Sequence, residues 1–141
     1  MELIAGSITA VAVVGLGRAT RQARSLPFYG NVLIVIALAY VLFAVMAEAP
    51  RTIAIESTVA AAFVAVAIAA ARGSNSSRAA GVLLAVGLGA HGVYDLVHPA
   101  LVPNSAVPSW WPLFCGVVDV LLAGWVVRLG LWDGATGRGG E

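Results

Sequence analysis

Charge is what this sequence has least of. Only 11% of its residues are Asp, Glu, Lys or Arg, whereas soluble globular proteins carry roughly 25%. Hydrophobic residues make up 60% of the chain, against roughly 45–50% in soluble proteins, and the mean hydropathy is +0.94. A surface with so little charge would not stay dispersed in water. The composition therefore excludes a soluble domain and predicts an integral membrane protein.

The features of several other protein classes are also missing. Cys115 is the only cysteine, which excludes an internal disulfide framework. The basic residues are all arginine and are spread along the chain without a nucleic-acid-binding motif, so we expect no nucleic-acid partner. The first apolar segment lacks the basic region of a signal peptide, because Glu2 is the only charged residue before Ser7. We expect that segment to be retained as a helix.

Five apolar segments meet or approach the length of about 20 residues that a helix needs to cross a membrane core of about 30 Å. They cover residues 2–18, 26–47, 52–72, 78–101 and 110–131. The predicted fold class is therefore all-α, a single transmembrane helical domain over residues 1–132. Short connections predict that sequential helices pack as antiparallel neighbours. The Gly-rich residues 133–141 are expected to form a disordered cytoplasmic tail.

The arginines predict how the chain is oriented. Seven of the eight lie in the first connection, around the third connection, or at and beyond the end of the fifth helix, and only Arg51 lies on the opposite side. Cytoplasmic loops carry the excess of Lys and Arg in membrane proteins. We therefore predict a multi-pass plasma-membrane protein with its N-terminus outside and its C-terminus inside.

Ionisable residues interrupt the apolar pattern of the predicted fourth helix. His91, Asp95 and His98 follow the spacing i, i+4, i+7 and fall within about 60° of the helix circumference. Such groups cost about 2.5–3.5 kcal/mol each at the centre of a membrane helix, and they are functional-site candidates for that reason. The stripe predicts a polar site that faces another helix.

Further polar residues lie at matching depths on the neighbouring helices. Cys115 and Asp119 share one face of the predicted fifth helix, about 7 and 13 Å below its outer end at 1.5 Å per residue. Glu56 lies about 6 Å into the predicted third helix from the same side. Two imidazoles, three carboxylates and a thiol are thus expected near one another in the outer half of the membrane.

These groups are typical ligands of Zn²⁺ and related transition metals. We therefore predict an outward-facing metal site between the fourth and fifth helices, formed by His91, Asp95, His98, Cys115 and Asp119, with Glu56 as a further ligand. Such a site would suit an enzyme acting on a lipid-soluble substrate that arrives from the bilayer. The residues alone do not decide whether the protein is an enzyme.

Three other interpretations of the same residues stay open. Cys115 is a candidate nucleophile, activated by a histidine that Asp95 orients. The carboxylates and histidines also suit a small ion or proton-coupled transporter, which would need to form a homo-oligomer to enclose a path. Finally, the protein would be an accessory subunit without a binding site. Its polar side chains would then form a hydrogen-bond network that holds the helices together, from His91 to Asp119 or from His98 to Asp95.

The stretch from residue 81 to 127 resembles an uncharacterised family of small bacterial integral membrane proteins, a domain-of-unknown-function family. The resemblance rests on His91-Gly-Val-Tyr-Asp95-Leu-Val-His98, a Pro-containing loop and Cys115-Gly-Val-Val-Asp119, with an upstream turn similar to Glu48-Ala-Pro50-Arg51. Two positions depart from the family pattern: Pro99 stands where a second His follows His98, and Ala49 separates Glu48 from Pro50. The resemblance implies that the motif residues act as a unit in a bacterial inner membrane, and it implies no activity.

Overall fold

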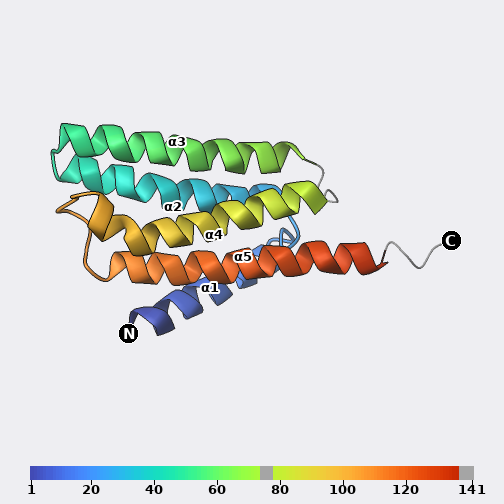
Figure 1. Ribbon diagram of the computed structural model, residues 1–141. Coiled ribbons are helices and arrows are strands. Elements are labelled where there is room, and N and C mark those ends of the chain that lie inside the picture. The colour runs from blue at the N-terminus through green and yellow to red at the C-terminus, as the bar shows by residue number, and fades with distance from the viewer. Residues whose placement is uncertain (74–77, 137–141) are drawn as a thin grey trace.

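The described part of the chain folds into a bundle of five helices (Figure 1). The computed structural model describes residues 1–73 and 78–136, with side chains up to Leu129. The helices are α1 (Glu2–Ala19), α2 (Leu26–Met46), α3 (Pro50–Arg72), α4 (Arg78–Leu101) and α5 (Trp111–Thr136), and the described part of the chain contains no strand. Each helix is long and apolar enough to cross a membrane. The predicted all-α bundle is confirmed, and its five spans fit a multi-pass membrane protein.

Local sequence signals explain where the helices begin. Ser25 caps α2, because its Oγ accepts a hydrogen bond from the backbone N–H of Phe28 at 3.3 Å, and Pro27 occupies the first turn. Pro50 is the first residue of α3, two residues before the predicted start at Thr52. Proline is favoured at this position because the first helical N–H needs no partner within the helix.

The end of α5 differs from the prediction. The helix continues to Thr136, so the prediction of a disordered tail is wrong for residues 133–136. A single helical glycine such as Gly134 costs only about 1 kcal/mol relative to alanine, which is not enough to end a helix. The rest of the predicted tail, residues 137–141, lies outside the described residues.

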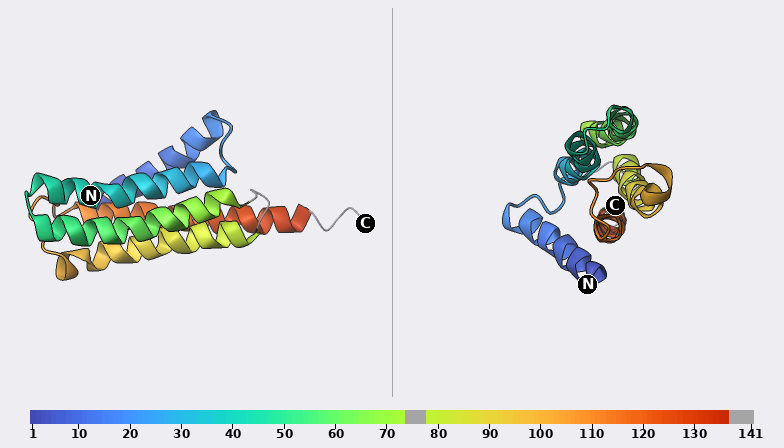
Figure 2. Two further views of the ribbon diagram at one scale, coloured as in Figure 1. Left: turned by 90° about the horizontal axis from the view of Figure 1, so that it is seen from above. Right: turned by 90° about the vertical axis from the view of Figure 1, so that its left-hand side faces the viewer.

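The helices pack as two antiparallel pairs with α1 at the edge. The pairs α2–α3 and α4–α5 lie side by side as expected, and α3 and α4 join them. The expectation that α1 would pack mainly against α2 is wrong, because α1 lies obliquely against α5 (Figure 2). Gly6 allows this close approach: a Cβ atom there would lie 2.8 Å from the backbone oxygen of Phe114.

The interior of the bundle divides into two halves along its length. One end, which we call the amino-terminal end, holds the N-terminus, the α2–α3 turn and the α4–α5 loop; the other, the carboxyl-terminal end, holds the α1–α2 and α3–α4 connections (Figure 1). Large apolar side chains fill the carboxyl-terminal half, among them Leu33, Leu84, Leu88 and Leu122. The buried polar and charged side chains lie in the amino-terminal half: Thr52, Glu56, His91, Asp95, His98 and Asp119.

Candidate metal centre

Three ionisable side chains converge between α4 and α5. His91 Nδ1 lies 2.7 Å from Asp119 Oδ2 and 3.5 Å from Asp95 Oδ2. One potential ligand atom from each of the three residues lies within 4.8 Å of those of the other two. His91 is 1% exposed, and Asp95 and Asp119 are completely buried. We call this group the His–Asp–Asp triad.

Glycines bring the backbones of α4 and α5 together beside the triad. A Cβ atom on Gly92 would lie 3.2 Å from Asp119 Cβ and 3.2 Å from the backbone oxygen of Gly116. This close approach lets the short Asp119 side chain reach His91 across the interface. The spacing of four residues from His91 to Asp95 then places both on the face of α4 that meets α5.

A tyrosine from α2 completes the surroundings of Asp95. The Tyr40 hydroxyl donates a hydrogen bond to Asp95 Oδ1 at 2.8 Å, and Tyr40 is 1% exposed. This contact could not be predicted from the sequence, because Tyr40 is the only polar side chain between Val32 and Met46 of α2 and no spacing relates it to α4. Its polar hydroxyl deep in an apolar segment was the only available signal.

Two oxygens of the triad have no hydrogen-bond partner among the described residues. They are Asp95 Oδ2 and Asp119 Oδ1, both buried. A buried polar atom without a partner typically costs about 1–3 kcal/mol, and more when the group is charged. Both oxygens belong to the carboxylates that face His91; the other buried side-chain atoms without a hydrogen-bond partner in the described part of the chain, Asn104 Oδ1 and Trp111 Nε1, lie nearer the amino-terminal end.

Glu56 and His98 form a second buried pair nearer the amino-terminal end. His98 Nε2 lies 2.7 Å from Glu56 Oε1, and the Tyr94 hydroxyl donates to Glu56 Oε2 at 2.8 Å. The predicted proximity of Glu56 to the α4 stripe is therefore present. His98, however, meets Glu56 of α3 and makes no hydrogen bond to Asp95. It lies about two helical turns from His91 toward the amino-terminal end, outside the triad.

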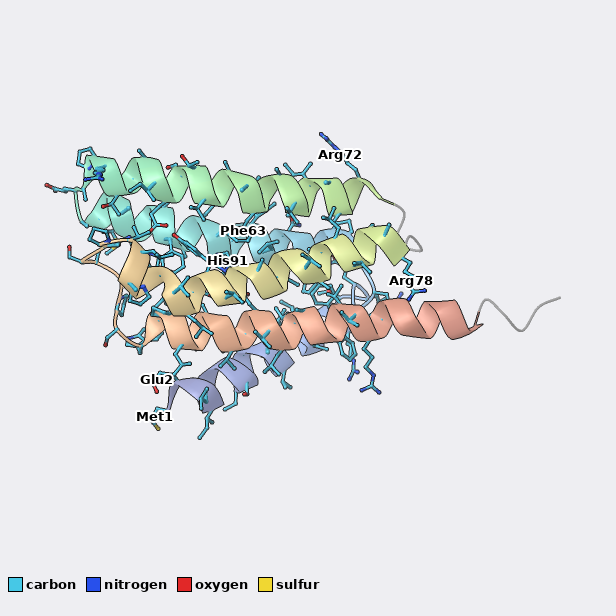
Figure 3. All side chains as sticks on the ribbon, in the orientation of Figure 1. Met1, Glu2, Phe63, Arg72, Arg78 and His91 are labelled. Carbon is cyan, nitrogen blue, oxygen red and sulfur yellow. The ribbon has the colours of Figure 1, made fainter. Side chains whose placement is uncertain are left out.

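Aromatic rings connect this second pair to the triad. The Tyr40 ring stacks on the His98 ring at a centroid distance of 4.1 Å, while the Tyr40 hydroxyl contacts Asp95. Phe63 of α3 points toward His91 of α4 (Figure 3), and their ring centroids are 4.7 Å apart. The triad therefore has an apolar wall on the α3 side and a shared aromatic partner on the α2 side.

Cys115 lies close to this site but outside the triad. Its side chain is 3% exposed and it precedes Asp119 by one helical turn. Its thiol does not belong to the group of ligand atoms that converge within 4.8 Å. Nor does either histidine form a hydrogen bond with it in the described part of the chain, since His91 contacts the two aspartates and His98 contacts Glu56. This arrangement gives no support to the nucleophile interpretation.

A cavity of about 580 Å³ opens at the amino-terminal end. It lies under the α4–α5 loop, and its lining includes His98, Pro103, Asn104, Ser105, Ser109 and Pro112. Asn104 Nδ2 also lies 3.3 Å from the backbone oxygen of Tyr40. The predicted outward-facing site is thus open only as far as His98, and the triad behind it is enclosed.

Comparisons with protein-family models, with curated proteins and with solved structures found no match. A function for this chain is therefore inferred from the geometry and chemistry of the triad and its surroundings. The resemblance to a bacterial membrane family stays an expectation from the motifs.

Proposed function

We propose that this protein binds a divalent transition-metal ion within the membrane through His91, Asp95 and Asp119. The observation that carries the proposal is their convergence: three ligand atoms lie within 4.8 Å of one another, and two buried carboxylate oxygens of the triad have no hydrogen-bond partner among the described residues. A cation between these side chains would satisfy both oxygens and offset the negative charge of the aspartates.

The donor set narrows the choice of metal. One imidazole nitrogen and carboxylate oxygens suit borderline ions such as Zn²⁺, Fe²⁺ and Mn²⁺ better than soft ions, which favour thiolate. We take Zn²⁺ as the first candidate, because a site with three protein ligands leaves a fourth position for water or a substrate. Tyr40 would orient Asp95 through its hydrogen bond, as outer hydrogen-bond partners commonly do for metal ligands.

Catalysis on a lipid-soluble substrate would use that fourth position, and it stays a prediction. The cavity beneath the α4–α5 loop offers the nearest route from the membrane surface, since His98 lines it. His98 in turn stacks on Tyr40, whose hydroxyl bonds Asp95. A ligand that reached His98 would therefore lie two contacts away from the triad.

The transporter interpretation has less support. A transported ion or proton needs polar groups along the whole membrane path. The buried charged side chains described here all lie in the amino-terminal half, whereas leucine, valine and alanine fill the other half. A single copy of the chain thus offers polar groups for half of such a route.

The proposal is tested by measuring the metal content of detergent-purified protein by elemental analysis. We expect about one metal ion per chain in the wild type and loss of that metal in Asp119→Asn, which keeps the shape of the side chain but removes its charge. His98→Gln is the matched control, because His98 is nearly as buried as Asp119 but lies outside the triad, and this variant should keep the metal.

A thermal-unfolding series separates the metal site from a purely structural network. Saturation with ligand at about 100 times Kd stabilises a folded protein by about 2.7 kcal/mol. We expect added Zn²⁺ to raise the melting temperature of chelator-treated wild type and His98→Gln, but not of Asp119→Asn. Wild type that neither carries metal nor responds to it would leave the His91–Asp119 pair as a structural bond between helices.

A further inference from the structure

A second cavity, of about 410 Å³, lies at the carboxyl-terminal end of the bundle. Three arginines from three separate segments line it: Arg18 of α1, Arg24 of the α1–α2 connection and Arg128 of α5. Ala23, Trp125 and Leu129 complete the lining, so no carboxylate is present among the described side chains that form it. The cavity is therefore strongly basic, and it lies far from the His–Asp–Asp triad.

The wall of this cavity is built from a chain of fixed contacts. The Arg18 guanidinium lies 5.2 Å from the centroid of the Trp125 ring, a cation–π distance. Trp125 Nε1 donates a hydrogen bond to the Tyr29 hydroxyl at 2.8 Å, and that hydroxyl donates to the backbone oxygen of Ala23 at 3.1 Å. Tyr29 is completely buried. These contacts hold the aromatic floor in place and direct Arg18 toward the cavity.

An apolar groove of about 390 Å³ continues from the basic cavity between α1 and α5. Its lining shares Arg18 and Trp125 with the cavity and otherwise consists of small and aliphatic residues: Ala10, Val11, Val14, Gly15, Leu121 and Leu122. From Arg18 to Val11 the groove follows α1 for about 10 Å toward the membrane centre, at 1.5 Å per residue. One continuous surface thus changes from cationic to aliphatic with depth.

We propose that this surface binds an anionic phospholipid, with the phosphate in the arginine cavity and an acyl chain in the groove between α1 and α5. Guanidinium groups bind phosphate oxygens through paired hydrogen bonds, and basic pockets at the cytoplasmic side of membrane helices recognise anionic headgroups. The predicted orientation places this end in the cytoplasmic leaflet. A lipid there has its phosphate at the membrane surface, level with the arginine cavity, and its acyl chains directed toward the membrane centre, along the groove.

The positive-inside rule accounts for arginines at this end, but not for their convergence on one cavity. Arg72 lies at the same end of the bundle, and its side chain points away from the helices (Figure 3). A second copy of the chain in the same orientation would bring arginines against arginines. Free phosphate would match the cavity but would leave the groove without an occupant, so a lipid fits both features with one molecule.

The test measures lipid binding to the detergent-purified full-length protein by native mass spectrometry and thermal shift. Dioleoyl phosphatidylglycerol is the anionic probe, dioleoyl phosphatidylcholine is the zwitterionic probe, and inorganic phosphate and a dihexanoyl phosphatidylglycerol test the headgroup without long chains. We expect retention and stabilisation with the long-chain anionic lipid, and at least about tenfold weaker binding of each other probe.

Three protein variants locate the site: two with arginines of the cavity replaced, and one with a residue of the groove replaced. Arg128→Gln alone should weaken binding of the anionic lipid about fivefold, and Arg18→Gln with Arg128→Gln about thirtyfold, since each basic residue near an anionic surface contributes a similar share. Val14→Phe, which fills the groove, should remove the advantage of the long chains. Arg72→Gln is the matched control and should bind like the wild type.

Three results would overturn the proposal. Equal binding of phosphatidylcholine would mean that the arginines take no part in recognition. Equal binding of phosphate or the short-chain lipid would reduce the site to an anion site without a chain groove. A loss in Arg72→Gln as large as in Arg128→Gln would assign the effect to overall surface charge. The single substitution Arg128→Gln keeps the test valid if the double variant does not fold.

Discussion

The two halves of this bundle are joined by different forces, although the same helices run through both. In the carboxyl-terminal half, α4 meets its neighbours through Leu84 and Leu88, which pack in an apolar core. In the amino-terminal half the same helix presents His91, Asp95 and His98, each hydrogen-bonded or paired with another helix. The change occurs within about two turns of one helix.

This difference indicates which half of a membrane bundle contains a binding site. Lipid tails are as apolar as leucine, so helices in a membrane gain no hydrophobic free energy by associating and depend on close packing and hydrogen bonds. The carboxyl-terminal half needs only close packing of complementary side chains to hold its helices together. The polar half contains more ionisable groups than joining the helices requires, and two of their carboxylate oxygens have no hydrogen-bond partner among the described residues. That excess is what indicates a binding site.

The largest expected effect comes from breaking the triad. His91→Ala should lower the free energy of unfolding of the chelator-treated protein by about 3–5 kcal/mol, because it leaves two buried carboxylates without their partner. Leu122→Ala in the other half, also completely buried, should cost less than the roughly 2–5 kcal/mol typical of water-soluble proteins, since in lipid only packing is lost. Reversible unfolding in mixed micelles measures both.

A double variant is the control for this comparison. Replacing His91 and Asp119 together by leucine removes a buried charge pair, and such replacements are often neutral or stabilising. The double variant should therefore be more stable than His91→Ala while binding no metal. A larger loss for Leu122→Ala than for His91→Ala would contradict the view that the polar half carries the more costly contacts.

Much of the fold could be predicted from the sequence. Hydropathy located the five helices, because the length of an apolar segment in a membrane protein corresponds directly to a span. At all helix ends except the end of α5, the predicted boundary differs from the observed one by two residues or fewer. The end of α5 and the partner of α1 could not be predicted in the same way. The first depends on a small glycine cost, and the second on a close approach between Gly6 and Phe114 that involves residues far apart in the sequence.

The sequence predicted how deep in the membrane the residues of the candidate site lie, but not which neighbouring helix each side chain faces. Spacing along α4 and α5 placed His91, Asp95 and Asp119 at similar heights, and the structure brings these three together. The rotation of α3 and α2 about their own axes is not encoded in any local pattern. The sequence therefore does not identify Glu56 as the partner of His98, or Tyr40 as the partner of Asp95.

A smaller effect is expected from two buried tyrosines, one in each half. Tyr40→Phe removes the donor to Asp95 Oδ1 and should cost about 1–3 kcal/mol, because a carboxylate oxygen is left without a partner. Tyr29→Phe leaves the half-buried Trp125 N–H without its acceptor, and we expect a cost of about 1 kcal/mol or less near the membrane surface, where water can replace it. Equal losses in the same unfolding assay would contradict this ranking.

The smallest expected change in stability tests the glycine contact that brings the triad together. Gly92→Ala and Gly89→Ala should each gain up to about 1 kcal/mol in helix propensity. At Gly89 the nearest atom to a new Cβ is Ala123 Cβ at 4.0 Å, an ordinary contact, so that variant should keep the gain.

At Gly92 the new Cβ would lie 3.2 Å from both Asp119 Cβ and the Gly116 oxygen. Because a backbone oxygen cannot rotate away, α4 and α5 must separate by a few tenths of an ångström, and overpacking of this kind typically costs about 1–3 kcal/mol. We expect a net loss of about 1 kcal/mol for Gly92→Ala and about tenfold weaker metal binding by competition titration, since disturbed supporting contacts commonly lower metal affinity by that factor. Metal affinity equal to that of Gly89→Ala would mean that the triad tolerates the separation and that the glycine contact serves packing alone.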